Sequence, residues 1–292
     1  MVKTQLQNLL ACPNCAKTLD IRPDKAFCSR CQKRFPVKNG VYYFEEIRGD
    51  ILPSHDTRIT DSRKWTPWRK KNYFYFQREL PASLKGKYVL DVGAGKGHFK
   101  ALFETANYVA IDFYDYENVN VIADVTKRFP FKDGVFDYLI LSNVIEHIFR
   151  PANLFTECHR VLKKTGIVII TVPFFIKIHQ EPHDFFRYTP YALEGLLAEA
   201  GFSNIAVEGL GDIFDIHQSN REEMLGIAHQ NLTRNVKKRY WRIIPRLYLR
   251  LVGKLTSFFF QTIKNNPLFR KYQEGKAEKT DHVPGYGIRA NK

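Results

Sequence analysis

The stretch that decides the fold is Tyr88-Val-Leu-Asp91-Val-Gly93-Ala-Gly95-Lys-Gly97-His-Phe99, an apolar run followed by glycines at every second position. The apolar run predicts a strand buried on both faces, and the glycines predict a tight turn that leads into a helix. Glycines let the backbone approach a ligand closely, and a helix N-terminus favours negative charge. The stretch therefore predicts a nucleotide-binding crevice at the end of a buried strand.

Three kinds of glycine loop fit this outline, and two of them fail in detail. A phosphate-binding P-loop requires Ser or Thr after Lys96, where the chain has Gly97. A dinucleotide fingerprint requires glycine at position 98, which is His98. The remaining pattern, Asp91-x-Gly93-x-Gly95-x-Gly97, resembles motif I of class I S-adenosylmethionine (SAM) methyltransferases.

The chain downstream supports this choice with an ordered series of strands. The expected strands are Val109–Asp112, Val121–Asp124, Phe136–Asn143, Ile167–Pro173 and, as the last, Val283–Ala290. A helix is expected around Leu154–Leu162, stopped by Gly166, and another over Tyr191–Ala200, with Thr189 as N-cap and Pro190 in the first position. The sequence thus predicts an α/β fold with a seven-stranded Rossmann-like methyltransferase sheet.

The resemblance implies which residues hold SAM. In such folds an acid at the end of the second strand accepts the ribose hydroxyls, here Asp112, and the acid after the third strand binds the adenine amino group, here Asp124. Either acid could instead be a plain strand-end cap. The full expected set is Asp91, Gly93, Ala94, Gly95, Gly97, Asp112, Phe113, Asp124, Val125, Ser142 and Asn143.

Histidines are the candidate catalytic residues, because a hydroxyl or amine acceptor must lose a proton and histidine titrates near neutral pH. The chain resembles a large, substrate-diverse methyltransferase group through Glu146-His147 and Asp184-x-x-Arg187-Tyr188-Thr189. His147 and His183 are the expected catalytic residues. Alternatively, His147 holds its loop through Glu146, and Arg187 forms a structural ion pair with Asp184.

The run Asn143-x-x-Glu146-His147 suggests a further alternative. It resembles the Glu-x-x-Glu-His metal site of small-RNA and quinone-biosynthesis O-methyltransferases, with a later histidine completing the set. Helical spacing would place Asn143, Glu146 and His147 on one face. Since an amide replaces the first carboxylate, the sequence favours no magnesium ion here.

Four cysteines form a separate N-terminal pattern: Cys12-x-x-Cys15, twelve residues, then Cys28-x-x-Cys31. Two such pairs predict one tetrahedral, closed, structural Zn²⁺ site, which a segment of this size needs for stability. With the flanking Leu10-Ala-Cys and Arg34-Phe-Pro-Val, residues 8–47 resemble the Trm112-like zinc ribbon of methyltransferase activators and of ribosomal-RNA guanine methyltransferases.

Composition and charge limit the remaining choices. The chain has 292 residues and a net charge of +15, with 44% hydrophobic and 26% charged residues, which excludes wholesale disorder. Residues 1–85 carry 17 basic and 8 acidic residues, residues 86–212 carry 12 and 16, and residues 213–292 carry 16 and 6. Neither a secretory signal nor a membrane-spanning run is found, so we expect a cytoplasmic protein. Its basic flanks favour a polyanionic partner or an anionic membrane surface.

The sequence does not decide what two of its basic segments bind. Residues 58–78 interleave cations with aromatic rings, which fits either a surface that binds single-stranded nucleic acid or a cap helix packed on the SAM cleft. Within 221–279, Arg242, Arg246, Arg250 and Lys254 form one helical stripe. This insertion could be a lid or oligomer contact, could bind nucleic acid, or could lie on a membrane through residues 231–265, at the inner face.

The sequence therefore predicts a zinc ribbon (1–50), a basic aromatic linker or cap helix (51–85), a methyltransferase domain (86–220 and 280–292) and a helical insertion (221–279). The expected activity is methyl transfer from SAM to an O or N atom of a small-molecule, lipid-linked or glycan acceptor. The alternatives are an RNA methyltransferase that uses ribbon and linker to bind RNA, and a SAM-binding scaffold without turnover. Formation of a homo-oligomer stays open.

Overall fold

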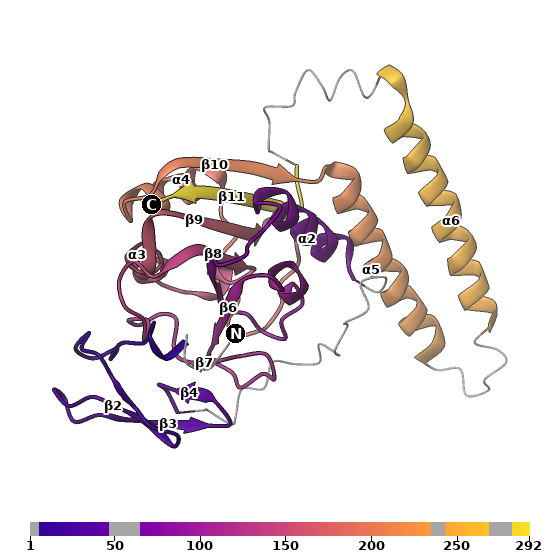
Figure 1. Cartoon of the computed structure of the whole chain (residues 1–292). Helices are drawn as coiled ribbons and strands as arrows, with labels where there is room; N and C mark the ends of the chain where they lie inside the picture. The colour runs from indigo at the N-terminus through magenta and orange to yellow at the C-terminus, as the bar shows by residue number, and fades with distance from the viewer. Residues whose placement is uncertain (1–5, 47–64, 235–242, 269–281) are drawn as a thin grey trace. The chain divides into compact units, whose positions relative to one another are not determined.

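The computed structural model describes residues 6–46, 65–234, 243–268 and 282–292 (Figure 1). These residues belong to two compact units. The first comprises Met1–Leu210 with Gly285–Lys292, and the second is Gly211–Pro284. We describe each unit by itself.

A central sheet dominates the first unit. Its seven principal strands lie in the order β7-β6-β5-β8-β9-β11-β10, and only β11 runs antiparallel to its neighbours. They are β5 (Tyr88–Val92), β6 (Asn107–Asp112), β7 (Val121–Ile122), β8 (Phe136–Ser142), β9 (Leu162–Pro173), β10 (Ser203–Leu210) and β11 (Gly285–Asn291). The predicted α/β, Rossmann-like sheet is thus confirmed. The strand order reverses beside β5, and such a switch point is where open α/β sheets bind their ligands.

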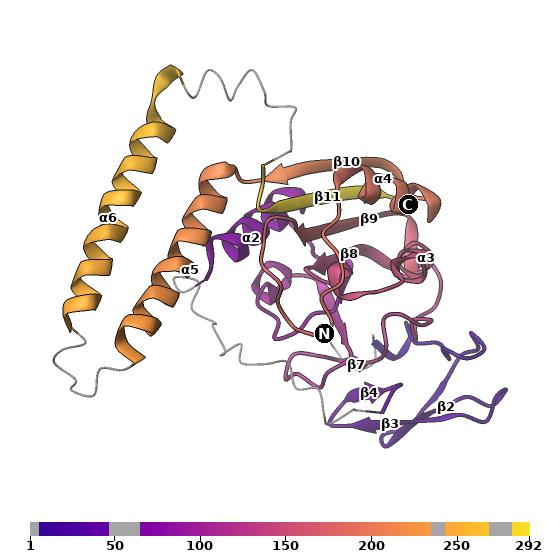
Figure 2. The same cartoon turned by 180° about the vertical axis from the view of Figure 1, so that it is seen from behind.

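Three helices cover this sheet: α2 (Pro67–Glu79), α3 (Pro151–Val161) and α4 (Pro190–Glu199). Helix α2 lies on one face and α3 and α4 on the other, as the two opposite views show (Figures 1 and 2). Helix α4 begins as predicted, because the Thr189 hydroxyl accepts a hydrogen bond from the Ala192 N–H and Pro190 follows it. Thr66 and Pro67 start α2 in the same way.

Two local predictions were wrong. No α-helix follows the glycine loop; the chain forms a 3₁₀ turn at Lys100–Phe103. Only residues 98–106 separate Gly97 from β6. This segment, in which Phe103 is buried, is too short for a three-turn helix. The helix expected around Leu154–Leu162 is found as α3, but Gly166 does not end it, because Leu162 already has extended backbone and starts β9.

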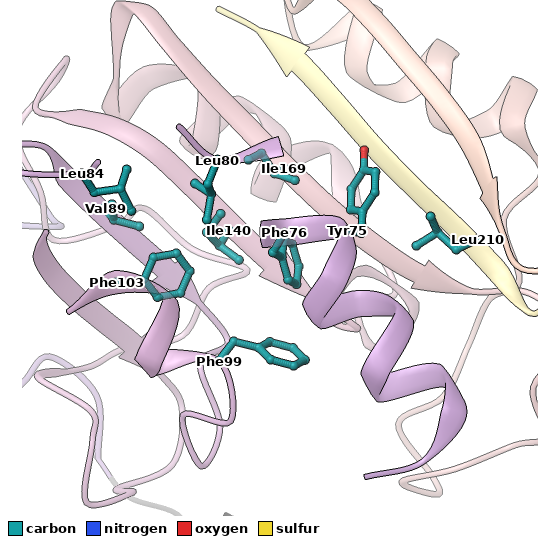
Figure 3. Close-up of a cluster of buried hydrophobic side chains, with 10 residues drawn as sticks. All are labelled: Tyr75, Phe76, Leu80, Leu84, Val89, Phe99, Phe103, Ile140, Ile169 and Leu210. Atoms are coloured by element: carbon teal, nitrogen blue, oxygen red, sulfur yellow. The ribbon is translucent and has the colours of Figure 1, made fainter. Parts of the chain in front are cut away.

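A cluster of buried side chains fixes α2 on the sheet (Figure 3). Tyr75 and Phe76 of α2 meet Val89, Ile140 and Ile169 of three adjacent strands. The other members are Leu80, Leu84, Phe99, Phe103 and Leu210. Each large apolar side chain buried in this way contributes about 1.5–3 kcal/mol. The aromatic segment thus forms helix α2 and packs Tyr75 and Phe76 on the sheet; residues 58–64 lie outside the described residues, and what the cations of the segment bind stays a prediction.

The N-terminal segment adds four short strands to the edge of the same sheet: β1 (Asp20–Ile21), β2 (Lys25–Phe27), β3 (Arg34–Lys38) and β4 (Val41–Tyr43). Strand β4 runs parallel to β7, with Tyr42 opposite Val121. Leu10 forms a β-bridge with Phe131, and the Ala11 N–H donates to the Pro130 carbonyl. The ribbon is therefore continuous with the α/β sheet.

The second unit is a pair of helices, α5 (Ile213–Arg234) and α6 (Ile243–Asn265). The two run side by side in both views (Figures 1 and 2). Lys264 forms a 2.8 Å ion pair with Asp212, and the rings of His217 and Phe260 stack. Neither these helices nor any other described helix is long and apolar enough to cross a bilayer.

Candidate functional site

The glycine loop after β5 has backbone angles that ordinary residues rarely adopt. Gly93, Gly95 and Gly97 have φ of 67°, 54° and 68°. A Cβ on Gly93 would lie 2.7 Å from Cγ2 of Val144, and one on Gly97 would lie 2.8 Å from the Asn118 side chain. A Cβ on Gly95 would meet nothing within 4 Å. Neighbouring side chains thus leave no room for a Cβ at Gly93 or Gly97, whereas the space beside Gly95 is open.

Asp91 is a buried carboxylate at the end of β5. The Tyr108 hydroxyl donates a 2.7 Å hydrogen bond to its Oδ2. Burial raises the pKa of Asp91 to about 7; the Tyr108 hydrogen bond opposes this rise and the nearby Asp112 adds to it. A cation placed beside Asp91 would favour its charged form.

Asp112 ends β6 and ties the glycine loop to that strand. Its Oδ2 accepts from the Gly95 N–H at 2.8 Å, and its Oδ1 accepts from the Tyr114 N–H at 2.9 Å. Burial raises the pKa of Asp112, while these backbone hydrogen bonds lower it in part. Each oxygen keeps a second lone pair for a hydroxyl donor.

Asp124 lies differently, because its Oδ1 accepts from both the N–H and the hydroxyl of Thr126, at 2.9 and 2.6 Å. Lys127 lies 3.5 Å from its other oxygen. Asp124 therefore caps its own turn, and Val125 beside it is buried.

Ser142 and Asn143 close the site at the end of β8. Asn143 has φ of 53°, and its Oδ1 accepts from the Trp68 indole N–H at 2.8 Å. Its amide donates to the Ser142 hydroxyl at 3.2 Å. Through Trp68, α2 is fixed directly to the strand end.

A cavity of about 400 Å³ lies over these strand ends, which is within the range of small-molecule sites. Six of the predicted cofactor residues line it: Asp91, Gly93, Ala94, Gly95, Ser142 and Asn143. The other lining residues are Arg69, Lys96, His98, Phe99, Tyr116, His179 and Gln180. Gly97, Asp112, Phe113, Asp124 and Val125 are not part of this wall.

The predicted catalytic histidines occupy unequal positions. His183 is exposed, and its carbonyl accepts from Nδ1 of His147 at 2.6 Å. Nε2 of His147 lies 3.6 Å from Glu146 Oε1, and Nε2 of His179 lies 3.7 Å from the same oxygen. The structure thus brings together Glu146, His147 and His179, of which His179 lines the cavity.

The alternative set Asn143, Glu146 and His147 does not lie on one helix. Residues Ile145–His147 form a 3₁₀ turn, while Asn143 has left-handed backbone and binds Ser142 and Trp68. The helical spacing assumed from the sequence is therefore absent at this turn.

Arg187 and Asp184 anchor the loop that carries His179. The two terminal guanidinium nitrogens of Arg187 donate to the two Asp184 oxygens at 2.6 and 2.9 Å. The same two nitrogens also donate to the Phe186 and Lys177 carbonyls, and Nε donates to the Ile176 carbonyl. Burial raises the pKa of the Asp184 carboxyl, but Arg187 and the His179 N–H outweigh it and hold the pKa at about 2. This is the structural ion pair considered from the sequence.

Sequence reasoning did not name Tyr108 or the cavity-lining His98 as contributors, and it placed Trp68 and Arg69 only within a segment that could form a cap helix over the cleft. The Asp91–Tyr108 contact follows from strand register, since Tyr108 on β6 lies opposite Val89 on β5. No local signal linked Trp68 to Asn143, which are 75 residues apart.

The four N-terminal cysteines meet in one cluster. Sγ of Cys12 and Cys31 are 3.5 Å apart, those of Cys15 and Cys28 are 3.4 Å apart, and all four lie within 4.8 Å of one another. None forms a disulfide. Four thiolates about 2.3 Å from one zinc ion would be about 3.8 Å apart, so the cluster fits a tetrahedral ion.

Comparison with known proteins gives consistent matches. Residues 90–170 match the family model described as "Methyltransferase domain". A probable S-adenosylmethionine-dependent methyltransferase of Mycobacterium tuberculosis is 26% identical over 160 residues, which are 49% of this chain and 58% of that protein. An uncharacterized protein of Methanocaldococcus jannaschii is 26% identical over 164 residues, 49% of this chain and 80% of that protein. The chain thus spans little more than half the length of the first relative.

A solved structure also resembles the chain. Phosphoethanolamine N-methyltransferase 2 of Haemonchus contortus, in complex with S-adenosyl-L-methionine, is 18% identical with a TM-score of 0.47. The match covers 76% of this chain and 52% of that one.

Proposed function

Since the chain carries a class I SAM-dependent methyltransferase domain, we propose that it binds SAM in the cavity over β5, β6 and β8 and transfers the methyl group to an O or N atom of its acceptor. When bound, SAM supplies a methyl group already activated on a sulfonium. The protein's part is then to bind, orient and exclude water. The observation that carries the proposal is the open glycine loop held to Asp112 through the Gly95 N–H.

The predicted cofactor residues divide into three roles in this proposal. Gly93, Ala94 and Gly95 offer backbone to the amino-acid end, where the carboxylate of Asp91 faces positive charge. Asp112 accepts ribose hydroxyls with the lone pairs that the loop leaves, beside Phe113. Asp124, with Val125, offers its partly exposed oxygen to the adenine amino group, and Ser142 and Asn143 face the methionine part.

We place the acceptor on the His179 side of the cavity. Of the expected catalytic residues, neither His147 nor His183 lines the wall, whereas His179 does and contacts the Glu146–His147 pair. His183 faces solvent and supports His147 through its backbone carbonyl. The cluster, and not His183, is the group positioned to meet an acceptor.

The exposed surface of α6 supports an acceptor that is a small molecule linked to lipid, because it has the character of a membrane-binding helix. On α6, Leu247, Leu251, Leu255 and Phe258 recur at helical spacing, and all are more than half exposed. Arg250 and Lys254 are exposed on the same helix; Arg242 and the side chain of Arg246 lie outside the described residues. An apolar stripe flanked by cations is typical of helices that lie in a membrane interface.

Flotation with anionic vesicles tests this surface. We expect the intact chain to float and a Leu251→Glu, Leu255→Glu variant to stay at the bottom. Ser219→Glu, Asn220→Glu is the matched control, because both residues are exposed on the other helix, α5, and add the same charge away from the α6 stripe. Equal flotation of both variants, or none of the intact chain, contradicts the membrane proposal.

We further propose that the cysteine cluster holds one structural Zn²⁺ with no open position. Binding energies of about 10–16 kcal/mol in zinc-finger peptides indicate that a segment this small depends on the ion. Cys15→Ser should lower the zinc content and expose the ribbon to proteolysis. Cys158→Ala, a buried cysteine in α3, should retain the zinc. Full zinc in Cys15→Ser would contradict the assignment.

Labelled methyl transfer into a cell extract, followed by fractionation into lipid, small molecules, RNA and protein, tests the activity itself. Label in lipid or small molecules is expected. Label in RNA, with affinity falling steeply from 50 to 200 mM salt, would support the RNA alternative. SAM binding without label in any fraction would leave the scaffold alternative.

A further inference from the structure

We propose that Glu146, His147 and His179 bind one divalent transition-metal ion, at a site separate from the cysteine cluster. The ligand atoms would be a Glu146 carboxylate oxygen and the Nε2 atoms of the two histidines. One atom from each residue lies within 4.8 Å of the other two.

The Glu146 carboxylate is the first observation that favours a bound cation. Its side chain is fully buried, and neither oxygen has a hydrogen-bond donor among the residues that the structure describes. A buried carboxylate without partners is unfavourable and uncommon, because nothing replaces the water it has lost. The Nε2 of His147, buried beside it, also has no hydrogen-bond partner within the described ranges.

The distances fit a shared ion better than direct hydrogen bonds. Oε1 of Glu146 lies 3.6 Å from His147 Nε2 and 3.7 Å from His179 Nε2. Both separations exceed the usual hydrogen-bond range. Two ligands at about 2.0–2.1 Å from a tetrahedral ion would be about 3.4 Å apart, so a small closure of the cluster completes the site.

The other ring nitrogen of each histidine has a partner that fixes its orientation. Nδ1 of His147 donates to the His183 carbonyl at 2.6 Å. Nδ1 of His179 lies 3.2 Å from Asp184 Oδ2 and 3.2 Å from the Lys177 carbonyl. Metal-bound histidines typically donate their second N–H to a carboxylate or a carbonyl, which turns the free nitrogen toward the ion. Both histidines show this arrangement, and both Nε2 atoms point at one carboxylate.

The backbone holds these three residues in place. The Glu146 carbonyl accepts from the N–H groups of Phe185 and Phe186, which joins the 3₁₀ turn to the loop between β9 and α4. Asp184 accepts from the His179 N–H at 2.7 Å and is itself fixed by Arg187. The cluster is therefore built from two segments that the fold keeps together.

The ligand set indicates the kind of ion and its use. Two imidazoles and one carboxylate suit Zn²⁺, Fe²⁺ or Mn²⁺ better than Mg²⁺ or Ca²⁺, which prefer oxygen. Three protein ligands leave positions open, as in catalytic metal sites. Since His179 lines the cavity, an open position would take an oxygen atom of the acceptor, such as a hydroxyl, carboxylate or phosphate group. This last step rests on the proposed function; the ion site does not.

Zinc content per folded chain tests the site. With ZnCl₂ supplied and excess removed by gel filtration, the intact chain should hold two equivalents, one of them in the cysteine cluster. His179→Ala and Glu146→Gln should each hold one equivalent. His183→Ala, which keeps the carbonyl bound to His147, is the matched control and should hold two. One equivalent in the intact chain, or two in both variants, overturns the proposal.

Anomalous diffraction at the zinc edge gives a readout that needs no variant. A peak between Glu146 Oε1 and the two Nε2 atoms is expected. A peak at the cysteine cluster alone would mean that a protonated His179 pairs with Glu146 instead, and would overturn the site. Titration calorimetry with S-adenosylhomocysteine, run on the zinc-loaded intact chain and on Glu146→Gln, tests cofactor binding separately from metal binding. If neither chain binds the compound, the proposed function fails, but the zinc count and the ion site stand unaffected.

Discussion

The glycine crevice and the histidine cluster meet at one cavity, which the cluster reaches through His179, yet they are built in different ways. The crevice consists of backbone held by nearby residues: Gly95 lies 17 positions from Asp112, to which it donates. The cluster consists of side chains from two segments more than 30 positions apart, which the Glu146 carbonyl and Nδ1 of His147 join, while Arg187 and Asp184 fix the loop that carries His179. A site made of backbone is sensitive to any added Cβ, whereas a site made of side chains is sensitive to loss of its anchoring ion pair.

Gly93→Ala should give the largest effect on the crevice. The added Cβ would stand 2.7 Å from Val144 at a φ of 67°, and left-handed strain alone costs about 1–2 kcal/mol. We expect affinity for S-adenosylhomocysteine to fall at least about 100-fold, because strain and overlap move the loop. Titration calorimetry measures this, with a thermal melt as a check on folding.

Gly195→Ala is the control for this substitution. Gly195 lies inside α4 with nothing within 4 Å of its Cβ position, so alanine should leave affinity unchanged and stabilise the fold by up to about 1 kcal/mol. Equal affinities of the two variants would show that the loop does not hold the cofactor.

Arg187→Lys tests the anchoring of the histidine cluster, and it should change stability more than cofactor affinity. Lysine keeps the charge but loses the two-pronged contact with Asp184 and most of the carbonyl contacts, so stability should fall by about 2 kcal/mol. Urea unfolding measures the loss. Affinity for S-adenosylhomocysteine should stay within about threefold of the intact chain, since the crevice is built separately. A larger drop would show that the two regions are one energetic unit.

The pH dependence of SAM affinity sharpens the comparison at Asp91. Its pKa of about 7 lies above the unfolded value, so in the empty protein the carboxyl is largely protonated below pH 7, and a cationic ligand must displace that proton. Affinity should therefore rise up to about tenfold per pH unit from pH 5.5 to 7 and level off above it. Tyr108 and Asp112 are the ionisable groups facing Asp91.

Asp91→Asn, which cannot ionise, should remove most of this slope. Calorimetry in two buffers of different ionisation enthalpy counts the released proton directly. Parallel pH profiles for both proteins would assign the slope to another group.

Trp68→Phe should give the smallest effect. It removes one hydrogen bond to Asn143 and retains an aromatic ring, which corresponds to about 0.5–1.5 kcal/mol. A fewfold loss of cofactor affinity, seen in the same titration, would show that α2 positions the end of β8. No change would restrict α2 to a packing role.

The contrast between local backbone features and contacts of distant segments also explains which parts of the fold and the site could be predicted from the sequence. The strand series and the caps at Thr189 and Pro190 were predicted because apolar runs, glycines and caps are local signals. The absence of a helix after Gly97 depended on how early β6 begins, and the pairing of His179 with Glu146 depended on the path of the loop after β9. Tertiary geometry decided both, and no spacing rule within one segment encodes it.

The central claim is that the loop from Gly93 to Gly97, fixed by Asp112, holds the methyl donor. Calorimetric titration of S-adenosylhomocysteine into the intact chain and into Asp112→Ala tests it most directly. One binding site per chain is predicted, with affinity at least about tenfold weaker in Asp112→Ala, since a charge-assisted hydrogen bond to the loop is lost. Absence of binding heat in the intact chain, or equal affinity in the two proteins, would contradict the account.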